Sequence, residues 1–300
     1  MNTDSPSGQL ASPQSADPAR SADPVRSAEQ PRVQTSSLQP RQYRPTATWV
    51  LVAVNVTIFL AMTALGGSTK PEVLVLFGAK VNSLIVQGQV WRLVTPIFVH
   101  IGLVHLAFNT YAIYVFGSQI ERFFGTARFL SIYMLTGIAG VLASFIFSPY
   151  PSAGASGAIF GLIGTEAAFF YRYRKAFGPG GQQRLYNILI VIGYNLAFTF
   201  VAPNIDVWGH LGGLLAGIVL TWGPRAMALG FRDRFGSPTT QGSRGPTWGL
   251  MPDYAIVLTE RGPQLVDTNR PKQWGKVVLG TVVLLSVSAL LAISLQAAGG

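Results

Sequence analysis

Six polar side chains interrupt stretches of the sequence that are otherwise apolar. An ionisable or strongly polar side chain is costly inside a lipid bilayer, so such a residue marks a candidate functional site. The six residues are His100, His105, Asn109, Ser156, Glu166 and His210. The three histidines are the only ones in the chain, and all three fall near the external ends of their stretches. One such residue alone is often just hydrogen-bonded within a helix bundle, but this clustering favours a site.

The Ser156 hydroxyl and the His210 imidazole are the two groups that can form an activated nucleophile. Ser156 lies among small residues in Gly154-Ala155-Ser156-Gly157, which leave its hydroxyl approachable. The preceding SPYPSAG cannot form regular helix, so we expect a helix to begin at Ser156, where unpaired backbone N–H groups can meet a developing oxyanion. With His210 in hydrogen-bond reach, the imidazole can take the hydroxyl proton. G-x-S-G alone is a weak motif, so its weight depends on this partner.

Glycines at helical spacing explain how the two groups could meet. One strip starts beside Ser156 and the other beside His210. The strips are Gly157 and Gly161, and Gly209, Gly213 and Gly217. Small residues four apart let two membrane helices pack closely, so we expect these two helices in direct contact.

Span two carries a second polar group of residues. His105 and Asn109 are four residues apart and therefore lie on one helical face. His100 is five residues before His105, and we expect it to point elsewhere, near the mouth of the span.

Two carboxylates are candidates for a third catalytic member, and neither fits well. Asp206 is four residues before His210 and could orient the imidazole as a triad carboxylate does, although a loop or helix-cap role suits it better. Glu166 is ten residues after Ser156, about 15 Å along a helix, which is too far for the same chemistry. We assign Glu166 no catalytic role and expect it to pair with a cytoplasmic-side group or an amide.

Composition excludes several classes of protein. Of 300 residues, 49% are hydrophobic and only 11% are charged, against roughly 25% charged in a soluble domain. The chain is therefore neither an ordinary water-soluble globule nor disordered throughout. It has no cysteine, which excludes disulfides, zinc–thiolate sites, iron–sulfur clusters and a cysteine nucleophile. The sequence predicts no metal and no cofactor.

Seven apolar stretches predict an all-α polytopic membrane protein. Several approach the ~20 residues that cross a bilayer. They lie near 48–66, 97–118, 129–147, 155–171, 185–202, 207–223 and 276–295. We expect four parts of the chain: a disordered cytoplasmic tail (1–45), a six-helix core (46–223), a polar cytoplasmic linker (224–273) and a seventh helix with a short external tail (274–300). Tyr254–Leu258 could form one short strand in the linker. The start of the chain lacks the basic-then-apolar pattern of a signal peptide.

The distribution of Lys and Arg predicts the orientation in the cell membrane. With the N-terminus in the cytoplasm, the external segments hold only Lys70, Lys80 and Arg92. Basic residues gather on the cytoplasmic side of membrane proteins, so we expect N-inside and C-outside. This distribution accounts for the net charge of +10 without a nucleic-acid partner. The first external loop, about 67–96, is long and amphipathic.

At this point the sequence resembles the rhomboid intramembrane serine proteases over about residues 48–223. The ordered set of motifs is specific, although each motif alone is modest. The set comprises Trp91-Arg92, His100-x4-His105-x3-Asn109, Glu121-Arg122 with Gly125, Gly154-x-Ser156-Gly157, and Gly209-His210 followed by glycines. The helix after the core resembles the six-plus-one subgroup.

The resemblance implies a Ser–His dyad without a required carboxylate. Ser156 would be the nucleophile and His210 the general base and then acid. His105 and Asn109 would join the Ser156 backbone N–H in the oxyanion hole, supported by Gly154, and Phe160 would pack on the catalytic imidazole. The implied substrates are transmembrane proteins cut near the external end of their helix, often beside small residues.

Two other functions compete with this reading. A non-catalytic rhomboid-like binder or chaperone would be suggested by loss of Ser156 or His210, and neither is lost. A transporter would spread polar residues through the membrane depth and contain an inverted repeat, whereas the polar cluster lies on one side and the halves show no repeat. The oligomeric state stays open.

Overall fold

The computed structural model describes most of the apolar part of the chain. The described residues are 1–2, 44–174, 177–222, 250–251, 254–259, 262–267 and 271–298. Most of the predicted N-terminal tail and much of the predicted linker lie outside them. The chain divides into two compact units, residues 1–39 and 40–300, and the second unit contains every element described below.

The helices of this unit match the seven apolar stretches. Within the described part of the chain, four are long and apolar enough to cross a membrane: α1 (Thr46–Ala64), α6 (Thr126–Phe147), α8 (Gly178–Val201) and the Gly275–Ala298 part of α11 (Pro271–Ala298). Two more are α7 (Ser156–Tyr173) and the shorter apolar helix α9 (Val207–Trp222). Together with the broken second span, they confirm the predicted all-α polytopic membrane fold.

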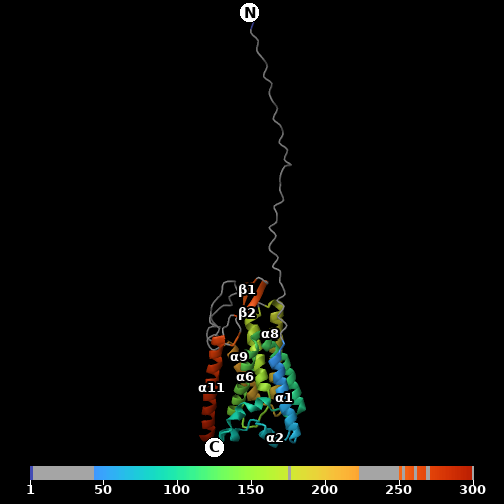
Figure 1. The fold of residues 1–300 in the computed structure, drawn as a ribbon, viewed down its shortest axis with the longest axis vertical. Helices are drawn as coiled ribbons and strands as arrows, with labels where there is room; N and C mark the ends of the chain where they lie inside the picture. Colours follow the sequence, from blue (N-terminus) through green and yellow to red (C-terminus); the bar gives the residue numbers. More distant parts are fainter. Residues whose placement is uncertain are drawn as a thin grey trace. The chain divides into compact units, whose positions relative to one another are not determined.

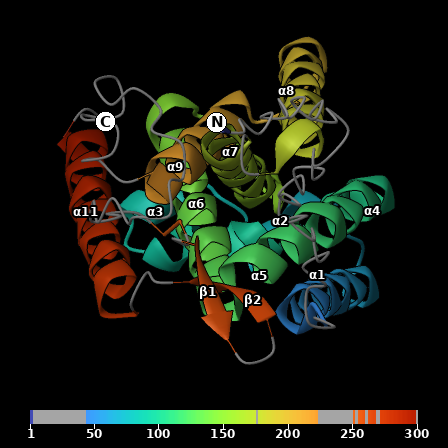
Figure 2. The same cartoon turned by 90° about the horizontal axis from the view of Figure 1, so that it is seen from above.

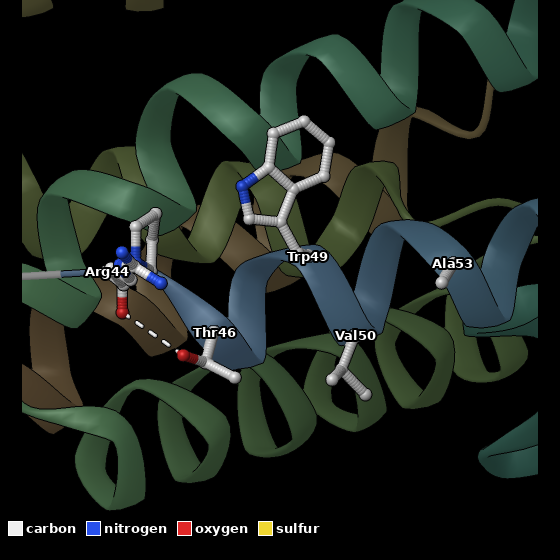
Figure 3. Close-up of a pocket in the computed structure, with 6 residues that line it drawn as sticks. Arg44, Thr46, Trp49, Val50 and Ala53 are labelled. Carbon is white, nitrogen blue, oxygen red and sulfur yellow. Dashed lines mark hydrogen bonds between the residues drawn. The ribbon is translucent and has the colours of Figure 1, made fainter.

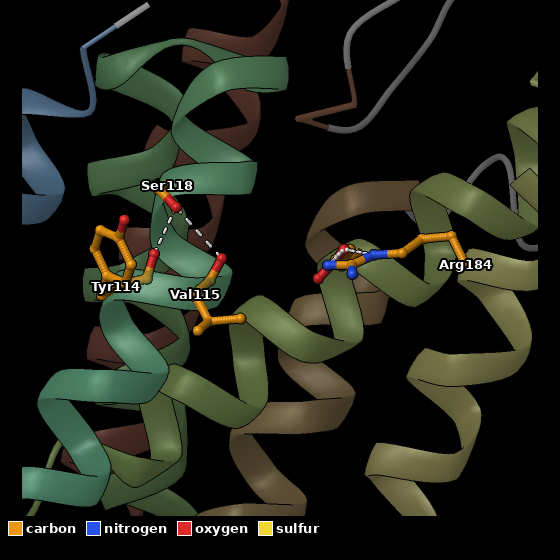
Figure 4. A network of polar contacts seen from close by, with 5 residues as sticks. Tyr114, Val115, Ser118 and Arg184 are labelled. Carbon is orange, nitrogen blue, oxygen red and sulfur yellow. Dashed lines mark hydrogen bonds and ion pairs between the residues drawn. The ribbon is translucent and has the colours of Figure 1, made fainter. Parts of the chain in front are cut away.

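The second span is built from three pieces. Helix α4 (Gly102–Ala112) passes through a π-helical turn, η3 (Ile113–Gly117), into α5 (Ser118–Phe124). The Ser118 hydroxyl donates to the carbonyl oxygens of Tyr114 and Val115 in this turn (Figure 4). Gly125, at φ 81°, then separates α5 from α6.

Helices α6, α7 and α9 form the centre of the unit, with α8 and α11 toward opposite edges (Figure 2). The predicted glycine strips explain the close contact of α7 with α9. A Cβ atom on Gly213 would lie 1.9 Å from the Gly157 carbonyl oxygen, and one on Gly217 would lie 2.0 Å from that of Gly161. Any side chain at these positions would therefore force the helices apart.

The loop between α1 and α4 is folded over the end of this bundle. It contains α2 (Pro71–Leu76), α3 (Asn82–Val86) and the 3₁₀ turns η1 (Val90–Leu93) and η2 (Thr95–Phe98). Lys80 in this loop forms an antiparallel β-bridge with Ser152, just before α7. The loop thereby holds the segment that leads into Ser156.

The predicted linker contains a β-hairpin where we expected a single strand. Strands β1 (Tyr254–Thr259) and β2 (Gly262–Asp267) pair antiparallel, from Tyr254↔Asp267 to Thr259↔Gly262. The second strand was missed because Gly262 and Pro263 are poor strand formers, and Pro is tolerated only on an edge such as this. The start of α1 and the end of α11 lie at opposite ends of the unit (Figure 1), as an odd number of spans requires.

Candidate active site

Ser156 is the first residue of α7, as its sequence context predicted. Its segment is irregular because α6 ends at Phe147 and two prolines, at 149 and 151, follow within four residues. The Gly154 backbone N–H donates to the carbonyl oxygen of Pro96 at 2.9 Å, which ties this segment to the loop before α4. Ser156 as a residue is only partly buried.

The Ser156 hydroxyl and the His210 ring lie in hydrogen-bond contact. His210 Nε2 is 2.8 Å from Ser156 Oγ, although the two residues are 54 positions apart. On the other side of the ring, Nδ1 is 2.8 Å from the hydroxyl of Thr199 on α8. The Phe160 ring stacks on the imidazole, with centroids 4.4 Å apart and an interplanar angle of 19°. The imidazole is therefore held at both nitrogens and on one face.

Asp206 is a helix cap in this structure. Its Oδ1 accepts the Gly209 backbone N–H at 2.9 Å, at the start of α9. This is the bond that an N-cap side chain makes to the third residue of a helix. Asp206 therefore has the helix-cap role that we preferred for it over that of a triad carboxylate. The side chain at His210 Nδ1 is Thr199 instead.

His105 faces Ser156 across the space left by Gly154. The Ile101 backbone N–H donates a long hydrogen bond of 3.4 Å to His105 Nδ1, so Nε2 carries the ring proton in the neutral form. Gly154 has φ 140°, and a Cβ there would lie 2.8 Å from His105 Nε2 and 3.7 Å from Ser156 Oγ. The missing side chain therefore lets the His105 ring, a hydrogen-bond donor, approach the backbone beside the candidate nucleophile.

Asn109 is buried on the same helix, one turn further on. Its Nδ2 donates to the His105 carbonyl oxygen at 2.8 Å. This bond uses one of the two amide hydrogens, and the second remains available to a ligand. Its Oδ1 is buried with no hydrogen-bond partner among the described residues.

The expected direction of the His100 side chain, away from His105, was wrong. His100 is completely buried, and its ring centroid lies 5.3 Å from that of His105. Its Nε2 accepts the Ala155 backbone N–H at 3.4 Å. The prediction assumed a continuous helix through His100, but α4 begins only at Gly102. His100 therefore lies before the helix and does not follow helical spacing. His100 thus hydrogen-bonds to the backbone of the residue before Ser156.

Glu166 is buried and paired away from the site, as its spacing from Ser156 indicated. The carboxylate of Glu166 on α7 lies 2.6 Å from Nη2 of Arg184 on α8 (Figure 4). Arg184 Nε donates a second hydrogen bond of 2.8 Å to the same oxygen.

The described residues contain no cluster of metal ligands, and one cleft is lined by residues other than those of this site. No three His, Asp or Glu side chains among them lie together as metal ligands would. A cleft of about 460 Å³ lies at the start of α1 (Figure 3). It is lined by Arg44, Pro45, Thr46, Trp49, Val50 and Ala53, none of which is a predicted site residue.

Thr199 is the site residue that the sequence did not reveal. It lies in the apolar run Ala197-Phe198-Thr199-Phe200, and a lone threonine in a membrane helix usually hydrogen-bonds to its own backbone. No local signal distinguishes it, because its partner His210 belongs to another helix.

Comparison with known proteins points to one family. The family model described as the Rhomboid domain matches residues 87–226. Rhomboid protease GluP of Bacillus subtilis (strain 168) is 48% identical over 192 residues, which cover 63% of this chain and 37% of GluP. RHOMBOID-like protein 9, chloroplastic, of Arabidopsis thaliana is 37% identical over 145 residues, covering 48% of this chain and 33% of the relative.

The YdcA protein of Bacillus subtilis (strain 168), which also bears the family's name, matches over more of its own length. It is 37% identical over 143 residues, which cover 47% of this chain and 70% of YdcA. The chain thus spans only about a third of the length of GluP and of the chloroplastic relative, but most of YdcA.

Proposed function

The chain belongs to the rhomboid family, and from this membership we propose that it is an intramembrane serine endopeptidase. Ser156 is the nucleophile, and His210 is the general base and then the general acid. The observation that carries the proposal is the 2.8 Å contact between Ser156 Oγ and His210 Nε2. This contact joins two helices at the point where glycines let them approach, and it is the geometry of an activated hydroxyl.

The reaction follows from the positions of these groups. His210 Nε2 removes the hydroxyl proton as Ser156 Oγ attacks the scissile carbonyl carbon. His210 then gives that proton to the leaving amine, which departs and leaves an acyl-enzyme ester on Ser156. Water, deprotonated by the same nitrogen, then attacks the ester carbonyl carbon. The bond to Ser156 Oγ breaks, His210 returns the proton to Oγ, and the acid product leaves.

The oxyanion formed in each half of the reaction is stabilised beside Gly154. The His105 Nε2–H lies close to Gly154, and the backbone N–H of Ser156 lies at the start of α7, where helix N–H groups have no partner within the helix. Asn109 contributes the second hydrogen of its amide. Donors aimed at the position where charge develops lower the barrier more than donors aimed at the ground-state carbonyl.

The proposed substrates are transmembrane helices of other proteins in the same bilayer. A membrane helix hides its peptide bonds in its own hydrogen bonds, so the segment to be cut must unwind before Ser156 can attack. Small or helix-breaking residues near the external end of the substrate helix would lower the cost of unwinding. Replacing them with leucine in a cleaved substrate should slow the reaction; an unchanged rate would contradict this part of the proposal.

The proposal includes the orientation and the division of the chain that the Lys and Arg distribution and the apolar stretches predict. The N-terminus lies in the cytoplasm and the C-terminus outside the cell membrane. Residues 46–223 are the catalytic unit, 1–45 and 224–273 are cytoplasmic, and 274–300 add the seventh span.

The decisive experiment is cleavage of a single-span protein in liposomes. Wild type, Ser156→Ala and His210→Ala are compared, with Ser118→Ala as a control because its hydroxyl bonds only to its own helix. Wild type and Ser118→Ala should cut, and both site variants should lose activity by about a thousandfold or more. Cleavage by Ser156→Ala would show a different nucleophile. Binding without cleavage by wild type would favour the chaperone-like alternative.

A further inference from the structure

Thr199 is a buried hydroxyl that contacts His210 from a third helix. It lies on α8 with a relative exposure of 2%. Its Oγ1 is 2.8 Å from His210 Nδ1 and 2.7 Å from the carbonyl oxygen of Asn195. Both distances are within the range of a strong hydrogen bond.

The Thr199 hydroxyl has a single hydrogen, and this decides which group donates in each of its two hydrogen bonds. A threonine hydroxyl has one hydrogen to donate, and a carbonyl oxygen can only accept. The Thr199 hydrogen is therefore directed to Asn195, which leaves an Oγ1 lone pair facing His210. His210 Nδ1 must then carry the ring hydrogen and donate it to Thr199. In that tautomer Nε2 has a free lone pair, and the Ser156 hydroxyl donates to it.

We propose that Thr199 is a positioning residue that holds His210 in the tautomer able to activate Ser156. The inference rests on the proposed function, and it gives Thr199 the orienting task that a triad carboxylate has in other serine proteases. Asp206, the carboxylate nearest in sequence, is occupied by the cap of α9. A neutral hydroxyl acceptor costs less to bury than a carboxylate, which suits a site within the bilayer.

The same bond makes α8 part of the active site. Phe160 stacks on the ring from α7, Ser156 holds Nε2 from α7, and Thr199 holds Nδ1 from α8. Among the described residues of α8, only Gly181, Ile188 and Thr199 are buried. The contribution of α8 to catalysis thus depends on one side chain rather than on an extensive packed face.

The test compares Thr199→Val with Thr199→Ser in the full-length protein. Valine keeps the shape and removes the acceptor, whereas serine keeps the hydroxyl. We expect Thr199→Val to lower kcat about ten- to a hundredfold, with KM changed less than about twofold, and Thr199→Ser to recover most of the rate. Thr221→Val is the matched control, because Thr221 is also fully buried and donates to the carbonyl four residues earlier, but faces no histidine.

The second readout is the tautomer of His210, observed by ¹⁵N NMR of histidine-labelled protein. The chain has three histidines, so a His210→Ala sample assigns the signals. At a pH where the ring is neutral, wild type should show a protonated Nδ1 and a bare Nε2, and Thr199→Val should show a mixture or the reverse.

Each outcome decides the proposal. Loss of the tautomer preference together with loss of kcat supports it, whereas an unchanged tautomer in Thr199→Val overturns it even if activity falls. A normal rate in Thr199→Val overturns it as well. If wild type cuts no substrate, the proposed function fails, and the NMR comparison still decides whether Thr199 sets the tautomer.

Discussion

Gly154 is the residue whose missing side chain matters most at the proposed oxyanion site. Its φ of 140° is in a region that L side chains rarely adopt, and a Cβ would lie 2.7 Å from His105 Cε1. An added methyl group would thus both strain the backbone and collide with the His105 ring beside Ser156 Oγ.

We predict that Gly154→Ala reduces kcat about a hundredfold or more, because it blocks the space in which the oxyanion forms. The control is Gly88→Ala. Gly88 has a φ of 98° and nothing within 4 Å of an added Cβ, so it carries backbone strain without blocking a site. Cleavage rates and thermal unfolding of both variants in detergent provide the comparison. Equal loss of activity in the two variants would show that strain alone is responsible.

At the scale of elements, side chains from other segments hydrogen-bond to the carbonyl oxygens at the carboxyl end of α6. Lys80 Nζ donates to the carbonyl oxygens of Ser144 and Ser148 at 3.1 and 2.8 Å. The carbonyl oxygen of Phe145, which follows Ser144, accepts hydrogen bonds from Asn82 of α3 and from Gln296 of α11. The last carbonyls of a helix have no partners within it, so these contacts join the first loop and α11 to the segment that leads into Ser156.

The buried Lys80 should make stability depend on pH. Burial lowers the pKa of Lys80 from 10.5 to about 8, and the Asp206 carboxylate only partly opposes this effect. Between about pH 8 and 10.5 the unfolded chain binds more protons than the folded one, so stability rises with pH across that window and is lost again as pH falls through 8. Relative to Lys80→Met, wild type should therefore gain about 1–3 kcal/mol from pH 7 to pH 10.

Thermal unfolding of both proteins in one detergent at several pH values measures this difference. Lys80→Met also removes hydrogen bonds, but that loss shifts its unfolding midpoint at every pH and cancels when the slopes are compared. Parallel pH curves for the two proteins would contradict the prediction.

The Glu166–Arg184 pair is the polar link between α7 and α8 at the other end of these helices. The side chain of Glu166 is 1% exposed and that of Arg184 is 31% exposed. Removing the Arg184 side chain would therefore leave the buried Glu166 carboxylate without this ion pair. We predict that Arg184→Ala destabilises the protein by about 1–3 kcal/mol, somewhat less than for a fully buried pair. Glu166→Gln should cost less, because it removes the charge and keeps the shape. A double-mutant cycle by thermal unfolding measures the coupling, and additive effects would show that the pair contributes nothing.

At the scale of the molecule, an odd number of spans places the start of α1 and the end of α11 on opposite sides of a membrane. The chain contains no cysteine, so a single introduced cysteine can be labelled without background. We predict that a membrane-impermeant maleimide labels Leu65→Cys on intact cells and labels Arg44→Cys only after the cells are opened. Leu65 follows α1 and Arg44 precedes it, so the pair tests the N-inside orientation directly. The reverse pattern would invert the proposed topology.

Much of the molecule followed from local properties of the sequence. The spans, the start of α7 at Ser156 and the close contact of two glycine strips were predictable, because hydropathy, helix-breaking residues and small-residue spacing can each be read over fewer than about twenty residues. The proposed pairing of Ser156 with His210 came from the same glycine spacing together with the family motifs.

Contacts between distant parts of the chain could be decided only by the tertiary structure. The sequence determined that a serine and three histidines lie in or beside apolar stretches, since composition and spacing are properties of the chain itself. Only the fold decided that His100 hydrogen-bonds to the Ala155 backbone, that the His105 ring packs against Gly154, and that the Thr199 hydroxyl lies 2.8 Å from His210 Nδ1. A hydrogen bond depends on a few tenths of an ångström between helices, and no local pattern specifies that distance.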